Sequence, residues 1–168
     1  MNDTIFEQVV YKKMTFKDRL PYLLMLIGMV LFCLISVLFL GSFAFVLMVI
    51  LFFVAYYQIF PRFNTEFEYT LFNDEFEISV IYGKEKRKSK AILNLQDAKC
   101  IAPSGAEQLD YYRTGKTIDF SSGIEGRKTY EIIANDGHTL CSYIIEPNEE
   151  MTKHMKRAAR NNMFIDLY

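Results

Sequence analysis

The chain has 168 residues, enough for one ordinary domain and a small addition, and its net charge of −1 indicates no particular class of partner. Residues 63–168 are slightly acidic overall and lack a stripe of basic and aromatic residues, which argues against nucleic-acid binding. Apolar residues make up 51% of the chain but are concentrated in one block, so their distribution says more than their number.

The first 19 residues are expected to form a cytosolic or interfacial segment. Within it, the stretch TIFEQVVYKK (4–13) groups apolar residues at a spacing that suits a helix: Ile5, Phe6, Val9 and Val10. This pattern predicts either a short interfacial helix leading into a membrane or a segment that packs against the soluble domain.

An uncharged apolar block runs from Leu20 to Phe60. About 18 such residues already suggest a membrane helix, and no cleavage site of a signal peptide follows. As one helix the block would reach roughly 60 Å, twice the thickness of the hydrocarbon layer. Gly41-Ser42 is a turn-like pair near its middle, so we expect two transmembrane helices, at about 21–40 and 43–60. One tilted span with a long buried or interfacial end is the alternative.

Basic residues flank this block and are absent from the turn inside it. Those before the block are Lys12, Lys13, Lys17 and Arg19, and Arg62 follows it. The positive-inside rule then places both termini in the cytoplasm, as in a multi-pass protein of the cell membrane. The lipid bilayer is thus the first expected partner, and residues 63–168 are the expected cytosolic domain.

After Arg62 the hydrophobic period changes to two. FEYTLF (67–72) and FEISVIY (76–82) alternate apolar with polar residues, which is typical of half-buried antiparallel strands. The three residues between them, NDE (73–75), read as a hairpin connection. Further short strands are expected at 90–95, 98–102, 116–120, 129–134 and 139–145, with longer loops at 103–115 and 121–127.

The last segment returns to a helical period. Asn148 is a good N-cap, and Glu149 and Glu150 suit a first helical turn. An amphipathic helix of about 15 residues is predicted, because its apolar residues fall on one side. These residues, expected to close the core of the domain, are Met151, Met155, Ala158, Ala159 and Met163.

These elements predict a membrane-anchored α+β protein. A transmembrane helical hairpin would be followed by a seven-stranded antiparallel β-barrel or sandwich, closed by the C-terminal helix. The run EYTLFNDEFEISVIYG, a basic tip and KAILNLQDAKCI resemble the opening of a bacterial pleckstrin-homology-like (PH-like) domain. Such domains commonly follow a pair of membrane helices, and the whole chain looks like small two-helix membrane proteins of Gram-positive bacteria.

The stretch GKEKRKSK (83–90) is the first candidate site for lipid or partner contact. Its basic residues are Lys84, Lys86, Arg87, Lys88 and Lys90. The resemblance implies lipid recognition by a basic loop between the first two strands, but that connection is the acidic NDE here, so those positions do not carry over. The remaining alternatives are general attraction to an anionic leaflet and a solvated tip that protects an edge.

The basic face of the last helix is the second candidate for lipid or partner contact. It comprises Lys153, Lys156, Arg157 and Arg160. Such a face can meet lipid or an acidic partner, but it is also the ordinary surface of a solvated helix.

Nothing in the sequence predicts catalysis, a metal or a cofactor. His138 and His154 have no nucleophile at a known spacing, and Cys33, Cys100 and Cys141 form no ligand motif. The expected function is a non-enzymatic, membrane-tethered binding or scaffolding module whose partner is another membrane or cytosolic protein. An anionic-lipid sensor that uses residues 84–90 and an accessory subunit of a larger membrane complex are the alternatives.

Overall fold

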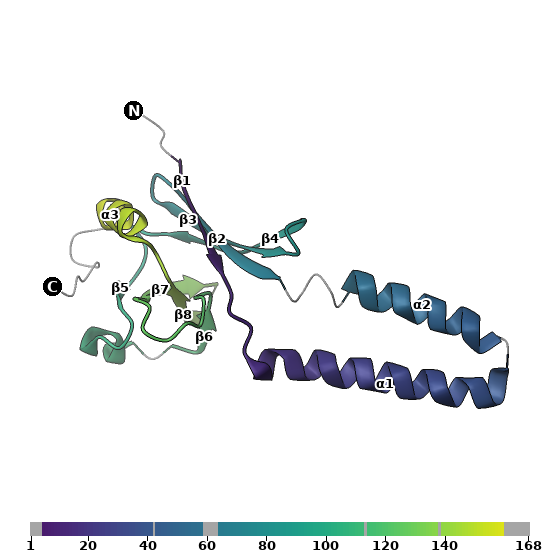
Figure 1. Ribbon diagram of the computed structural model, residues 1–168. Helices are drawn as coiled ribbons and strands as arrows, with labels where there is room; N and C mark the ends of the chain where they lie inside the picture. Colours follow the sequence, from purple (N-terminus) through teal and green to yellow (C-terminus); the bar gives the residue numbers. More distant parts are fainter. Residues whose placement is uncertain (1–4, 42, 59–63, 113, 138, 160–168) are drawn as a thin grey trace.

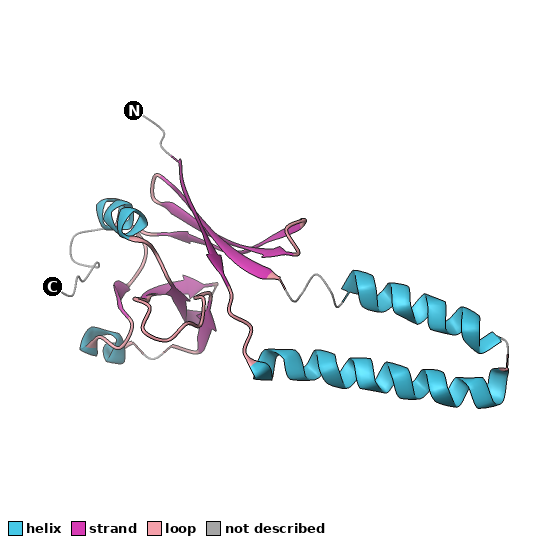
Figure 2. Ribbon diagram, viewed as in Figure 1, coloured by secondary structure: helices cyan, strands magenta, loops and turns pink. Residues whose placement is uncertain are grey.

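The computed structural model describes residues 5–41, 43–58, 64–112, 114–137 and 139–159. These residues form two four-stranded sheets, a helical hairpin and a C-terminal helix (Figures 1 and 2). In chain order the elements are β1 (Ile5–Tyr11), α1 (Phe16–Leu40), α2 (Phe43–Gln58), β2 (Thr65–Phe72), β3 (Glu75–Tyr82), β4 (Lys86–Asn94), β5 (Cys100–Pro103), the 3₁₀ helix η2 (Glu107–Tyr111), β6 (Lys116–Asp119), β7 (Tyr130–Asp136), β8 (Thr139–Ile145) and α3 (Glu149–Ala158).

Helices α1 and α2 form an antiparallel hairpin that projects from the sheets (Figure 1). They agree with the predicted helices, except that α1 begins at Phe16 and contains Pro21, and that residues 59 and 60 lie outside the described part. Small side chains are buried in the hairpin, notably Cys33, Ser36 and Ala44, which permits close approach of the two helices. Arg19–Leu38 is long and apolar enough to cross a membrane, and the second apolar segment, Phe43–Tyr57, is shorter.

The N-terminal segment is a strand, so the prediction of an interfacial helix at residues 4–13 is wrong for the described residues from Ile5 on. The alternative, packing against the domain, is confirmed, because β1 pairs antiparallel with β2 from Ile5 opposite Phe72 to Tyr11 opposite Glu66. Val10 is buried in the core and Phe6 packs against it, while Glu7 and Val9 point to the other, exposed face. The hairpin therefore interrupts the domain after its first strand, instead of preceding it.

The first sheet has the order β1-β2-β3-β4, and its strands are all antiparallel. One face of this sheet supplies much of the core. Large side chains that are almost fully buried there include Tyr69, Leu71, Phe76 and Ile78. The strands predicted at 67–72 and 76–82 are confirmed and are slightly longer in the structure.

The second sheet has the order β5-β7-β8-β6, and β6 pairs with β8 in parallel. Of the two predicted alternatives, the sandwich agrees with the two sheets, whereas the seven-stranded antiparallel barrel is wrong in three respects. The described residues form eight strands because β1 was missed, one pair is parallel, and the two sheets share no ladder that would close a barrel. The structure is an open α+β sandwich, in which the predicted loop 103–115 also contains η2.

Helix α3 covers one end of the sandwich, opposite to the side from which the hairpin projects (Figure 1). The Asn148 side chain caps it by accepting a hydrogen bond from the Met151 amide at 2.7 Å. Met151 and Met155 are buried in the core, as predicted. The helix has 10 residues instead of about 15, because Ala159 is an extended C-cap, and Met163 lies outside the described residues.

Candidate binding surface

The basic stretch 83–90 forms a tight turn followed by an edge strand. Gly83 and Lys84 both have positive φ, of 60° and 64°, and the Glu85 amide donates to the Tyr82 carbonyl at 3.2 Å. Strand β4 begins at Lys86, so the prediction that residues up to Ser89 form the tip is wrong. The start of β4 was not predicted, because a strand on an exposed edge can carry polar side chains on both faces and then lacks the alternation of apolar and polar residues.

Strand β4 leaves one edge open. It pairs with β3 on one side and ends the described order of the first sheet on the other. Residues 86–90 are all exposed. The open edge of β4 therefore presents main-chain groups that pair with no described strand, together with a high density of positive charge.

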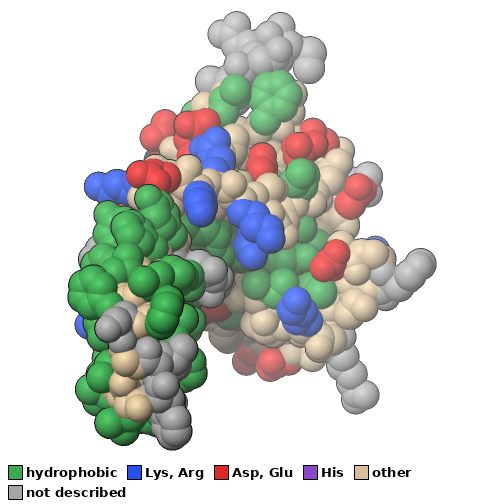
Figure 3. Space-filling model, turned by 90° about the vertical axis from the view of Figure 1, so that its right-hand side faces the viewer, with side chains coloured by type: hydrophobic (Ala, Val, Ile, Leu, Met, Phe, Trp, Pro, Cys, Tyr) green, Lys and Arg blue, Asp and Glu red, His purple; other side chains and the backbone are tan. Residues whose placement is uncertain are grey.

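The register places this basic turn at the end of the sheet that joins the hairpin. Tyr82 lies opposite both Thr65, where β2 begins, and Lys86, where β4 begins. The Gly83 amide also donates to the Asn64 carbonyl at 2.8 Å. Figure 3, viewed toward the hairpin, shows Lys and Arg side chains on the domain face around the base of the hairpin.

One basic residue of this stretch already has an acidic partner. Arg87 forms an ion pair with Glu68, whose side chain is 8% exposed on the central strand β2. A buried carboxylate needs a counter-charge, since its desolvation is costly. Arg87 is therefore assigned a structural role, and the charge offered to a ligand comes from the neighbouring lysines.

The second predicted basic set lies elsewhere. Lys153, Lys156 and Arg157 are on α3, and Arg160 lies outside the described residues. Phe6 stacks on His154 of this helix, with ring centroids 3.4 Å apart, and Phe6 pairs with Leu71 toward the other end of the sheet. The two basic sets thus lie at opposite ends of the first sheet, and they do not form one surface.

A cavity of about 460 Å³ lies at the base of the hairpin. The linker between β1 and α1, the first turns of α1, three strands of the first sheet and the end of β6 all contribute to it. Its lining residues are Lys12, Met14, Pro21, Tyr22, Thr65, Phe67, Val80, Tyr82, Lys90, Asp119 and Phe120. No local sequence pattern predicts this cavity, because its walls come from segments far apart along the chain.

Lys90 reaches this cavity because of an irregularity in β4. The β3–β4 register jumps from the pair Ile78 and Ala91 to the pair Ser79 and Ser89, which leaves Lys90 as an extra residue. A bulge of this kind bends the strand and turns a side chain in a new direction. The linker on the other side is fixed by backbone hydrogen bonds, from the Lys12 amide to Thr65 at 3.1 Å and from the Lys13 amide to Ser122 at 2.8 Å.

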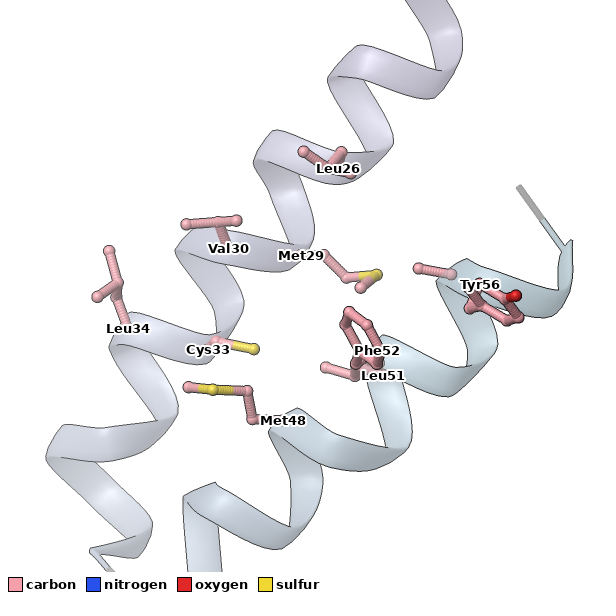
Figure 4. Close-up of a pocket in the computed structure, with 10 residues that line it drawn as sticks. Leu26, Met29, Val30, Cys33, Leu34, Met48, Leu51, Phe52 and Tyr56 are labelled. Carbon is pink, nitrogen blue, oxygen red and sulfur yellow. The ribbon is translucent and has the colours of Figure 1, made fainter. Parts of the chain in front are cut away.

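A second cavity, of about 740 Å³, runs between α1 and α2 (Figure 4). Met29 and Cys33 face Phe52 and Met48 across it. Its lining is apolar apart from the hydroxyl of Tyr56, so it suits hydrocarbon.

A buried polar cluster ties the two sheets together close to the strand ends. Tyr69 donates its hydroxyl hydrogen to the Phe120 carbonyl at 2.6 Å and accepts a hydrogen bond from the Glu146 amide at 3.2 Å. Burial raises the pKa of Tyr69 well above its usual value, and burial raises the pKa of Tyr143 to about 12. The Glu146 carboxylate accepts a hydrogen bond from the Ser122 amide at 3.0 Å. The Tyr69 hydroxyl and the Glu146 carboxylate therefore have a structural role, because both bond to backbone groups of the domain.

Within the described residues, no three His, Cys, Asp or Glu side chains are grouped so that they could hold a metal ion. The three cysteines are free and buried, and burial raises the pKa of the Cys100 thiol, which disfavours its reactive thiolate form. His138, one of the two histidines, lies outside the described residues.

The family model described as a bacterial PH-like domain (DUF6106) matches residues 2–165. The chain belongs to this bacterial PH-like domain family. No curated protein and no solved structure matches it. The PH-like domain suggests a binding or scaffolding module.

The PH-like resemblance predicted from the strand pair and basic tip is confirmed. The prediction that residues 73–75 connect the first two strands is wrong. Because β1 precedes the hairpin, the acidic connection Asn73–Glu75 joins the second and third strands, not the first two. The loop between the first two strands of this PH-like domain is occupied by the helical hairpin itself. The basic turn at Gly83–Glu85 follows the third strand and lies at the same end of the sheet as that hairpin.

Proposed function

We propose that this protein is a non-enzymatic binding module held at the cell membrane by the α1–α2 hairpin, with its PH-like domain and both termini in the cytoplasm. The observation that carries the proposal is the pairing of β1 with β2 across the hairpin. These strands belong to one sheet and must lie on the same side of a membrane. If α1 crosses the bilayer, α2 must therefore cross back.

The length of α2 fits this arrangement with a small adjustment. Its 16 residues reach roughly 24 Å, a few Å short of the hydrocarbon thickness. A short span is accommodated by local thinning of the bilayer at modest cost. The basic residues Lys12 and Lys13 before α1 favour a cytoplasmic position for the domain.

The open edge of β4 is the proposed contact for a partner protein. An extended segment can add to a sheet edge through main-chain hydrogen bonds, and acidic side chains on it would complement Lys86 and Lys88. Such a partner is either cytosolic or the cytosolic part of another membrane protein.

Photo-crosslinking in intact cells tests this assignment. A photoreactive amino acid at Ser89 on β4 is expected to form adducts of discrete protein mass, and the variant Lys86→Glu/Lys88→Glu should abolish them. The matched charge reversal Lys153→Glu/Arg157→Glu on α3 should leave them intact. Equal adducts from Glu7 on the opposite edge strand, or adducts that survive the β4 charge reversal, would contradict the proposal.

A second candidate function is the sensing of an anionic lipid surface by residues 84–90. The position of this turn at the hairpin end of the sheet favours it, because each lysine near an anionic leaflet contributes about 1 kcal/mol. In the crosslinking experiment this function predicts lipid adducts at Ser89 in place of protein adducts.

A further inference from the structure

We propose that strand β1 is a self-association surface, where a second copy of this chain pairs its own β1 antiparallel and joins two first sheets into one. This inference goes beyond the proposed function, because β1 is the edge of the first sheet opposite to β4. The proposed membrane tether serves only to hold both copies in one layer.

The outer side of β1 presents main-chain groups that pair with no described strand. The Lys12 amide donates to the Thr65 carbonyl at 3.1 Å, and the β1–β2 register continues from there to Ile5 without a break. Hydrogen-bonded pairs alternate along an antiparallel ladder, so the even-numbered residues of β1 bond to β2. The odd-numbered residues therefore direct their N–H and C=O groups away from the sheet, and these are Ile5, Glu7, Val9 and Tyr11.

Strand β1 lacks the charges that protect the other edge of the same sheet. The start of β4, KRKSK, is almost entirely basic, whereas β1, IFEQVVY, has Glu7 as its charged residue. The apolar side chains on its outer face are exposed, from 42% for Val9 to 67% for Tyr11. Proteins normally block such an edge with charge, because it attracts another strand. An edge left apolar is therefore expected to be covered by a specific strand.

Strand β1 is also held rigidly, despite the hairpin that follows it. On its core side, Gln8 Nε2 donates to the Glu146 carbonyl at 2.8 Å, and Gln8 Oε1 accepts a hydrogen bond from the Asn148 amide at 2.8 Å. Phe6 stacks on His154 next to these bonds. The edge is thus fixed in an extended conformation, which lowers the entropic cost of adding a strand.

The sequence of β1 suits pairing with itself. A pair symmetric about Gln8 brings Ile5 opposite Tyr11 of the second copy, and Glu7 opposite Val9 of the second copy. This register uses every outward main-chain group and sets a β-branched residue against an aromatic one, which stabilises antiparallel sheets. A register symmetric about Glu7 would instead set two carboxylates opposite each other, and one symmetric about Val9 would leave Ile5 unpaired.

Two copies paired in this way can insert into the same membrane. The two-fold axis that relates two antiparallel strands is perpendicular to both. Because β1 runs across the direction in which the hairpin projects (Figure 1), this axis can lie along the hairpin, so that both hairpins point the same way. Confinement to one membrane then raises the effective concentration of the two edges.

Disulfide crosslinking tests the pairing in membranes of cells that coexpress two differently tagged chains, with the native cysteines replaced by alanine. One chain carries Glu7→Cys and the other Val9→Cys. Mild oxidation should join them, because opposite residues have Cα atoms about 5.5 Å apart, within the range of a disulfide. Two chains that both carry Glu7→Cys, or both Val9→Cys, should give little product, because identical positions are offset by two residues.

Two substitutions of Val9 test the register without a disulfide. Val9→Glu sets a carboxylate opposite Glu7 of the second copy and should weaken association roughly fivefold, whereas Val9→Lys complements Glu7 and should retain the dimer. Native mass spectrometry of the full chain in detergent measures the dimer fraction, and circular dichroism checks the fold. Equal dimer fractions of the two variants would overturn the register.

A chain that is monomeric and forms no disulfide between positions 7 and 9 would overturn the proposal. A disulfide between Glu7→Cys and Ser89→Cys would show head-to-tail pairing of copies and would also overturn it. Lys86→Glu/Lys88→Glu should leave the β1 disulfide unchanged, so a failure of the β4 contact and a failure of the β1 pair are distinguishable. Photo-crosslinking at Glu7 should give an adduct of twice the chain mass, which differs from the adducts expected at Ser89.

Discussion

The α1–α2 hairpin exposes most of its large apolar side chains, whereas the sheets of the PH-like domain bury theirs. Phe43 on α2 is 77% exposed, whereas Phe76 on β3 is fully buried. Most large apolar residues of α1 and α2 are exposed, and Figure 3 shows apolar side chains over the visible face of the hairpin. In the sheets, apolar residues alternate with polar residues. The domain therefore closes its own core, whereas the apolar surface of the hairpin stays exposed.

This difference shows that an apolar helical hairpin can be inserted inside a domain without contributing to the core of that domain. The ends of the hairpin return to one register position, since the Lys12 amide bonds to the Thr65 carbonyl. The domain needs only a turn at this point. Because β1 pairs with β2 across the inserted hairpin, the first sheet depends on a strand that is remote from it in sequence.

The largest expected effect follows from removing the hairpin in two ways. Replacement of residues 13–64 by Asn-Gly joins Lys12 to Thr65 through a turn that suits a two-residue β-hairpin, so the product should be water-soluble and fold cooperatively. Truncation to residues 63–168 removes β1 and uncovers the core next to Phe67, so this fragment should aggregate. Gel filtration and circular dichroism would compare them. Equal behaviour of the two proteins would show that β1 is not part of the domain.

Within the domain, Tyr69→Phe should have the next largest effect. The substitution keeps the ring but leaves the buried Phe120 carbonyl and Glu146 amide without their partner. A loss of about 1–3 kcal/mol in the free energy of unfolding is expected. Urea denaturation of the full chain in detergent measures it, with the exposed Tyr111→Phe as the control. Equal stability of the two variants would contradict this assignment.

The buried tyrosines also predict alkaline sensitivity of the domain. Burial raises the pKa of Tyr143 to about 12, so above pH 10 the unfolded chain loses this proton while the folded domain keeps it. The unfolded state then binds fewer protons, and stability should fall by up to about 1.4 kcal/mol per pH unit until the folded pKa is reached. Tyr143→Phe should reduce this slope between pH 10 and 12. An unchanged slope would assign it to other groups, including Tyr69.

A smaller effect is expected from Asn148→Ala. This change removes the side-chain acceptor for the Met151 amide and should cost about 1 kcal/mol of unfolding free energy. Asn148→Ser should restore most of that stability, because serine also caps helices. If serine is no better than alanine, the cap does not hold α3 on the core.

The sequence predicted the parts of the fold that have a clear local period. Strands β2, β3, β7 and β8, the α1–α2 pair and the capped start of α3 follow from spacing and turn residues. Strand β1 was missed because neighbouring apolar pairs in IFEQVVY also suit a helix. The parallel β6–β8 pair has no local signal, since strand partners are chosen by packing across the domain.

The candidate site was predicted only in part. The lysines of residues 84–90 are exposed at an edge, as a charge-rich stretch suggests, but their position near the hairpin depends on the register of three strands. Arg87 proved to be paired with Glu68, and the cavity that unites Lys12 with Lys90 needs both β1 and the bulge in β4. Such convergence cannot be inferred before the strand order is known.

The most direct test of the central claim is cysteine accessibility on both sides of the hairpin. Single cysteines at Glu7, Ser42 and Ser89 would be placed in a chain whose native cysteines are replaced by alanine, and intact cells would be treated with a membrane-impermeant thiol reagent. An anchor inserted within one cytoplasmic domain predicts labelling at residue 42, and labelling at 7 and 89 only after permeabilisation. Labelling of residue 7 or residue 89, but not both, in intact cells would place β1 and β4 on opposite sides of the membrane and contradict the account.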